Sequence, residues 1–99
     1  MNLDPEQLTI NHNPLAKRFE ASLGDYIAIL TYRMRDEDTI VFTHTGVPAA
    51  MSGQGIGSKL AQTGLAYARE SGLGVIATCP FMAGYIDRHP EYQDLLVPR

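Results

Sequence analysis

The periodicity of the apolar residues changes once along this chain of 99 residues, at a glycine-rich segment near its middle. Before that segment, in residues 26–35, apolar and polar side chains divide between two faces by alternation, which is typical of a strand. After it, over residues 56–69, apolar residues recur at every third or fourth position, which is typical of a helix packed on a sheet. We therefore expect an α+β fold.

The first half of the chain is predicted to form a meander of antiparallel strands at residues 8–13, 17–22, 26–35 and 39–45. Glycine and acidic residues separate the later strands and favour tight turns. In the second half, the short apolar run at residues 73–78 has the pattern of a strand buried on both faces.

The order strand, helix, strand predicts a right-handed crossover between parallel strands. Pro80 suits the first turn of a short C-terminal helix, and Pro90 ends it. The expected architecture is thus an antiparallel meander followed by one β-α-β unit and a short helix.

Composition limits the class of protein. Hydrophobic residues make up 44% and charged residues 19% of the chain, which fits one globular domain over residues 1–99. The net charge of −3 gives no general attraction to nucleic acid. No apolar run reaches the roughly 18 residues of a membrane span, and the N-terminus does not resemble a signal peptide, so a soluble cytoplasmic protein is expected. The single cysteine excludes an internal disulfide, and we predict no metal site.

The glycine-rich segment at residues 52–58 lies between a predicted strand and the long predicted helix. Glycine permits positive φ, so backbone N–H groups can converge ahead of the helix N-terminus, where a phosphate is stabilised. One interpretation is a pyrophosphate cradle, and the other is a tight turn without a ligand. The residues concerned are Ser52, Gly53, Gln54, Gly55, Ile56, Gly57 and Ser58.

The run GQGIGSKLAQTGLAYARESGL from Gly53 resembles the acyl-CoA-binding loop and helix of the GCN5-related N-acetyltransferases. HTGVP before it and CPFMAGYIDRHPEY after it resemble the minimal single-domain subgroup often called the YjdJ type. The resemblance covers residues 13–96. It implies the fold of that superfamily, in which the two central strands splay apart.

The resemblance also implies acetyl-CoA as cosubstrate and acetyl transfer to an amine. The pyrophosphate would lie on the amides of residues 53–58, and the pantetheine arm would lie between the splayed strands, bonded by the backbone around Val47. The acyl group would then lie near four side chains, those of His44, Thr45, Cys79 and Tyr85.

Two positions depart from the family pattern. Ser52 stands where the family loop usually has Arg or Gln, which removes one side-chain contact to phosphate. Gly46 stands where the subgroup commonly has Glu, so no carboxylate at this position can take a proton from the amine.

Cys79 is the only thiol, and it lies between the buried strand and the helix that begins at Pro80. A helix N-terminus stabilises a thiolate, so Cys79 is a candidate acyl carrier or a partner of CoA in a mixed disulfide. The alternative is a small residue that fills the strand end, because free cysteine is often fully buried.

His44 is predicted to share a strand face with Ile40 and Phe42, with Thr43 and Thr45 on the opposite face. An imidazole can take a proton from an attacking amine near neutral pH. The alternative is a strand histidine bonded to a neighbour.

Tyr85 lies on the predicted C-terminal helix, where many acetyltransferases of this kind have a tyrosine that protonates the leaving CoA thiolate. The alternative is an aromatic core residue with its hydroxyl bonded elsewhere. His12 is expected at the surface. Arg33 and Arg35 are expected at a solvated strand edge, and the alternative is that they line a substrate mouth.

Three functions follow from these residues. The first is a minimal acetyl-CoA-dependent N-acetyltransferase that acts on an unidentified amine, as a monomer or homodimer. The second is a non-catalytic, redox-responsive module in which Cys79 pairs with CoA. The third is an interaction domain whose loop binds nothing.

Overall fold

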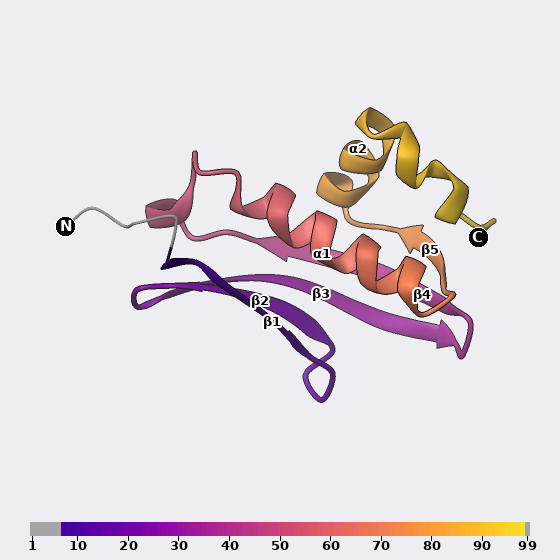
Figure 1. Cartoon of the computed structure of the whole chain (residues 1–99), viewed down its shortest axis with the longest axis horizontal. Coiled ribbons are helices and arrows are strands. Elements are labelled where there is room, and N and C mark those ends of the chain that lie inside the picture. The colour runs from indigo at the N-terminus through magenta and orange to yellow at the C-terminus, as the bar shows by residue number, and fades with distance from the viewer. Residues whose placement is uncertain (1–6, 99) are drawn as a thin grey trace.

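The computed structural model describes residues 7–98 and folds them into one sheet, with α1 (Ile56–Glu70) packed along one face of it (Figure 1). The first three strand pairings are antiparallel and the last is parallel, which confirms the α+β prediction. In spatial order, which is also sequence order, the strands are β1 (Thr9–Asn13), β2 (Arg18–Leu23), β3 (Tyr26–Asp36), β4 (Thr39–Gly46) and β5 (Gly74–Ala77).

In the part of the chain that the structure describes, α1 lies along the sheet and α2 lies beyond its β5 edge (Figure 1). Its helical segments include η2 (Ala49–Met51), α1 (Ile56–Glu70), α2 (Pro80–Arg88) and η3 (Pro90–Leu95). The strands and α-helices predicted from sequence lie within one residue of these bounds. η2 was not predicted, because its sequence Ala-Ala-Met carries no turn signal.

The core lies between the sheet and the helices. Ala28 and Leu30 of β3 are fully buried on the α1 side, whereas Ile27 on the opposite face is 51% exposed. Gly64 brings α1 close to the sheet, because a Cβ there would lie 2.9 Å from Leu30 Cδ2 and 3.0 Å from Phe42 Cε1. The predicted alternation of β3 and the close contact at Gly64 are thus confirmed.

His12, which was expected at the surface, is half-buried in an aromatic cluster. Its ring stacks on Phe19 at 4.4 Å and meets Tyr67 edge-on at 4.5 Å, and its Nε2 lies 2.6 Å from the Tyr32 hydroxyl. The β1–β2 hairpin carries His12 over these rings, a long-range pairing that a short strand sequence does not reveal.

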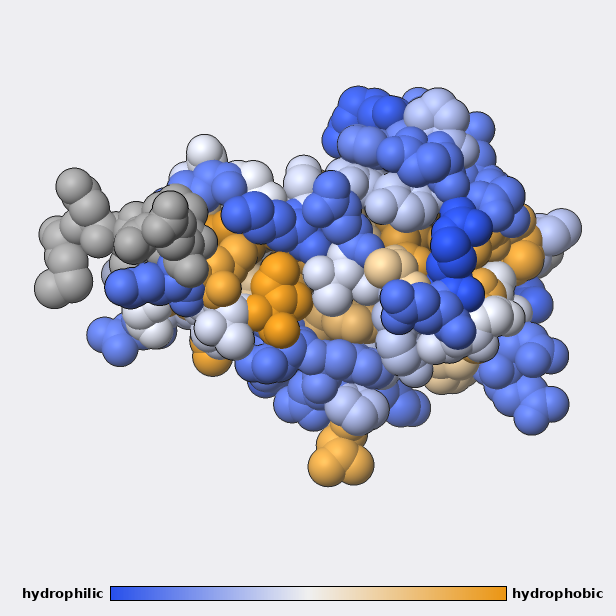
Figure 2. Space-filling view, viewed as in Figure 1, coloured by the Kyte–Doolittle hydropathy of each residue, from blue (hydrophilic) through white to orange (hydrophobic). Residues whose placement is uncertain are grey.

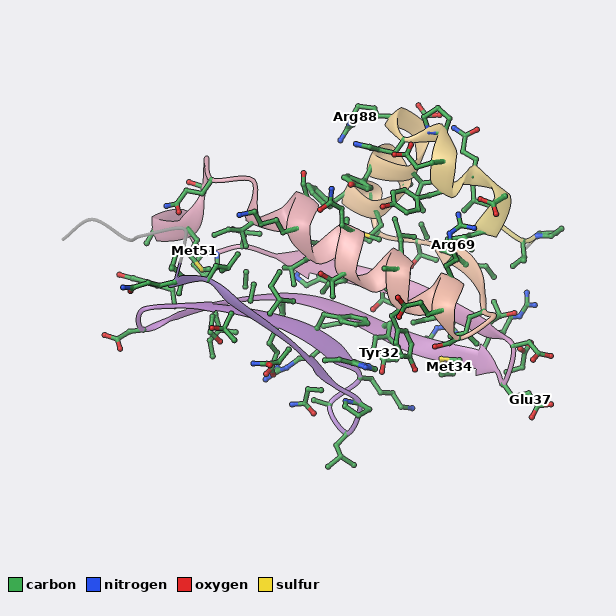
Figure 3. All side chains as sticks on the ribbon, in the orientation of Figure 1. Tyr32, Met34, Glu37, Met51, Arg69 and Arg88 are labelled. Carbon is green, nitrogen blue, oxygen red and sulfur yellow. The ribbon has the colours of Figure 1, made fainter. Side chains whose placement is uncertain are left out.

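The C-terminal segment packs against α1, whereas the tip of the β1–β2 hairpin is exposed to solvent. The C-terminal segment is fastened to α1 by Arg69, which points toward it (Figure 3) and donates to both carboxylate oxygens of Asp94 at 2.8 and 2.9 Å. Leu15 at the tip of the β1–β2 hairpin is 99% exposed, and Figure 2 shows a hydrophobic projection there. Arg69 therefore holds η3 beside α1.

The central strands separate after Phe42. The β4–β5 ladder ends at the pair Phe42↔Ala77, and the Phe42 carbonyl accepts the N–H groups of Thr78 at 3.0 Å and Cys79 at 3.3 Å. β5 then gives way to α2, while β4 continues to Gly46 beside β3 alone. This is the splayed strand pair that the family resemblance implied.

A β-bulge at Thr43 changes which way the end of β4 faces. Thr31 is paired with His44 and Tyr32 with Phe42, so Thr43 is the extra residue. His44 therefore lies on the outer face of the sheet, away from α1, and Thr45 lies on the α1 side. The prediction that His44 shares a face with Phe42 is wrong, because a bulge breaks the period of two.

We predict that Gly64→Val lowers the free energy of unfolding by about 1–3 kcal/mol, because the added methyl groups meet Leu30 and Phe42. Ala66→Val on the exposed face of α1 is the matched control, and helix propensity alone should cost it at most about 0.7 kcal/mol. Urea unfolding measures both, and equal losses in the two variants would contradict the close approach.

Candidate active site

The loop before α1 forms an open set of backbone donors. Gly53 has φ +81° and Gly55, the N-cap of α1, has φ +70°, a region that favours glycine. The N–H groups of residues 56–58 lie in the first turn of α1 and therefore have no intrahelical acceptor. No side chain caps this helix end either. The loop therefore presents several donors at the positive end of the helix dipole, as the cradle interpretation requires.

Gly57 differs from the other two glycines. It lies inside the first turn of α1 with no positive φ, and a Cβ there would lie 2.8 Å from Cζ of Phe81. The positive φ that glycine permits is therefore not used at Gly57. Its missing side chain instead lets Phe81 of α2 pack against the start of α1.

Ser52 and Gln54 show how the loop side chains are arranged. The Ser52 hydroxyl donates to the Ala49 carbonyl at 2.7 Å, so it turns back on η2 and away from α1. The Gln54 side-chain oxygen is buried and has no hydrogen-bond partner among the described residues. An unsatisfied buried oxygen costs about 1–3 kcal/mol unless a further donor reaches it, so a donor on a bound ligand would stabilise it.

Cys79 lies at the point where the sheet opens. It is 5% exposed, is the N-cap of α2, and its Sγ lies 3.4 Å from Oγ1 of Thr45. Burial raises the pKa of this thiol, but hydrogen bonds from Thr45 and from the backbone of Met82 and Phe81 outweigh burial, so the pKa lies below its usual value. Such a thiol forms a thiolate more readily than a free cysteine.

Tyr85 is a buried residue of α2. Its ring stacks on His89 at 3.9 Å, and its hydroxyl oxygen is buried without a hydrogen-bond partner among the described residues. Burial raises the pKa of Tyr85. The Gln62 side chain of α1 approaches the hydroxyl and partly offsets that rise, although the two groups do not reach hydrogen-bond geometry. The hydroxyl thus stays protonated at neutral pH and lacks an acceptor.

The structure brings some of the sequence-predicted residues together and separates others. Thr45 and Cys79 are in contact, whereas His44 lies on the other face of β4. The ring contacts of Tyr85 are with His89 and Tyr92.

Val47 follows β4 directly and is half-buried, packed against the core and beside the strand end. The contact of Thr45 with the thiol was expected only from the family resemblance. The alternation of β4 had placed Thr45 on the wrong face, and no sequence signal marks the bulge at Thr43 that brings it inward.

Within residues 7–98, no three His, Cys, Asp or Glu side chains come together in a way that could hold a metal ion. Over the same residues, no helix is long and apolar enough to cross a membrane.

Comparisons with known proteins agree with this geometry. The family model described as GCN5-related N-acetyl-transferase matches residues 18–95, and the chain belongs to this family. The chain is 28% identical to Protein NATD1 of Xenopus tropicalis over 102 residues, covering 98% of this chain and 94% of that protein. It also matches the NMR solution structure of a GCN5-like putative N-acetyltransferase from Staphylococcus aureus, with a TM-score of 0.74 and 32% identity, over 93% of this chain and 90% of that one.

We predict that the Cys79 thiolate appears at a lower pH than the ordinary cysteine value of 9.0, because hydrogen bonds to the sulfur favour the anion. Thr45→Val removes one of these bonds while burial persists, so the midpoint moves to higher pH. Ultraviolet thiolate absorbance against pH measures it. Thr43→Val, on the exposed side of the bulge, is the control, and an unchanged midpoint in Thr45→Val would refute the role of that hydroxyl.

Proposed function

We propose that this chain binds acetyl-CoA and transfers its acetyl group to an amine. One observation carries the proposal: β4 continues past the end of its pairing with β5, and the uncapped start of α1 and the Cys79 thiol lie beside that opening. An unpaired strand edge can bond an extended ligand, as an added strand would. Family membership supports the same ligand.

The residues present fit this cosubstrate. A Cβ at Gly53 or Gly55 would meet nothing within 4 Å, so a pyrophosphate has room against the loop amides. The arm would lie along β4 toward Thr45, with the backbone around Val47 as its hydrogen-bonding partner. The buried, unpartnered oxygen of Gln54 lies in the same loop and would accept from an amide of the ligand.

The side chains can supply the chemistry of acetyl transfer. The Cys79 thiolate attacks the thioester carbonyl, the bond to the CoA sulfur breaks, and CoA leaves as a thiolate that Tyr85 protonates. An amine then attacks the acetyl-cysteine, the Cys79 thiolate leaves, and the ammonium proton passes to His44 or to water. Thr45 stabilises the thiolate at both stages.

We predict that Gly55→Ala weakens CoA binding about tenfold or more, equivalent to ~1.4 kcal/mol, because the altered φ moves the loop donors. Gly72→Ala at the other end of α1 is the matched control, since Gly72 has φ +69° and equally open surroundings. Both variants should lose similar stability, and calorimetry should find affinity reduced in Gly55→Ala alone. Equal affinity in the two would refute the loop as the binding site.

A second candidate is a CoA-binding module without turnover, and Gly46 favours it because no carboxylate stands there to take the amine proton. In this case the Cys79 thiolate attacks CoA disulfide, a protein–CoA disulfide forms, and one CoA leaves as the thiolate.

We predict that wild-type protein mixed with acetyl-CoA gains the mass of one acetyl group, and that Cys79→Ala binds acetyl-CoA but gains none. Intact-mass spectrometry with and without an amine panel measures this. An acetyl adduct that disappears as an amine is acetylated supports the enzyme. An adduct with CoA disulfide and no amine product supports the module, and a full transfer rate in Cys79→Ala makes the thiol a packing residue.

A further inference from the structure

The sheet face turned away from α1 carries an open groove at the end of β4, with a volume of about 500 Å³. Its apolar lining is formed by Ile27 and Ile29 of β3 together with Val47 and Pro48. The one charged lining residue is Arg18 of β2. The volume lies in the range of small-molecule sites, and the lining combines an apolar surface with a single cation.

The groove adjoins the proposed site of acetyl transfer. Gly46 lines it, and a Cβ at Gly46 would lie only 3.3 Å from Nε2 of His44, so the imidazole stands over this glycine. The residue between them, Thr45, contacts the Cys79 sulfur on the other side of the strand. The thiol and the groove therefore flank the same end of β4, where the ladder to β5 has already ended.

Arg18 lines the groove, and His44 lies next to Gly46 of its lining. Arg18 is paired with Thr31, and Thr31 with His44, so the three form one row across neighbouring strands. Two strand spacings separate the backbones of Arg18 and His44 by about 10 Å. A ligand that spans the row therefore has its two functional groups well apart.

Arg18 has donors to spare for a ligand. It contacts Glu20 through Nε at 2.6 Å, and its side chain is 38% exposed. Within residues 7–98, its two terminal nitrogens make no hydrogen bond. A guanidinium binds a carboxylate through two parallel hydrogen bonds, which makes the terminal nitrogens a carboxylate site.

We propose that this groove binds the acetyl acceptor, and that the acceptor is an aliphatic amine with a carboxylate at its far end. The carboxylate lies on Arg18, the aliphatic body lies over Ile27 and Ile29, and the amine lies beside His44. The inference rests on the proposed function, because it supplies the nucleophile for that reaction. The amine nitrogen bonds to the acetyl carbon as the carbon–sulfur bond breaks, sulfur leaves as a thiolate, and the ammonium proton goes to His44.

Three linear amines of one chain length test the class of acceptor: aminocaproate, hexylamine and hexamethylenediamine. We predict that kcat/KM for aminocaproate exceeds that for hexylamine about tenfold, since a hydrogen-bonded charge pair contributes at that level. The diamine should be the poorest, because its second ammonium faces Arg18. In Arg18→Gln, the ratio of aminocaproate to hexylamine should fall toward unity through a rise in KM for aminocaproate.

Two variants serve as controls. Arg33→Gln removes an exposed arginine on the same sheet face but outside the groove, and the ratio should persist. Glu20→Gln removes the competing carboxylate, and the ratio should persist or rise. Amine acetylation with no preference for aminocaproate, or a preference that survives Arg18→Gln, would overturn the groove while leaving the proposed transfer in place.

A binding measurement separates the two proposals if no amine is acetylated. Aminocaproate titrated into the wild-type protein should shift the methyl NMR signals of Ile27 and Ile29, and the shifts should vanish in Arg18→Gln. Shifts that follow this pattern support the groove even when transfer fails. Unchanged signals in the wild type overturn it.

Discussion

The end of the parallel ladder at Phe42 is the constraint on which the rest of the structure depends. The Phe42 carbonyl accepts from the N–H groups of both Thr78 and Cys79, and the Thr78 hydroxyl also donates to it at 3.2 Å. These are the last contacts of the β4–β5 pairing, and after them the chain turns into α2, which begins at Pro80. The turn places the Cys79 thiol at a helix N-terminus and leaves the end of β4 open along one edge. The opening and the position of the thiol thus both follow from where this pairing ends.

The bulge at Thr43 places the reactive side chains of β4 on opposite faces of the sheet. It turns Thr45 toward α1 and the thiol, and turns His44 toward the outer face. Without it, strict alternation would put His44 in the core beside Phe42, where an imidazole would need a buried partner. One extra residue therefore gives β4 a thiol-facing side and a side that carries the imidazole.

Much of the fold was predictable because its signals are local. The alternation of β3, the helical spacing after Ile56 and the proline at the start of α2 each act over a few residues, and the structure confirms them. Gly53 and Gly55 were correctly expected to have positive φ, since both precede a helix in a turn. Gly57 has no positive φ, and the side chain that requires a glycine there, Phe81, is brought close only by the packing of α2 on α1.

The sequence alone determined the order of strands and helices, the glycine-rich loop with its free helix N-terminus, and the family, because these depend on neighbouring residues and their spacing. Only the tertiary structure decided which candidate residues meet. It brought Cys79 into contact with Thr45 and placed His44 on the outer face. It also buried the Tyr85 hydroxyl, which has no hydrogen-bond partner within residues 7–98. The physical reason is register: a bulge, a ladder end and a helix docking are set by long-range pairing, and shifting any of them by one residue moves a side chain to the opposite face.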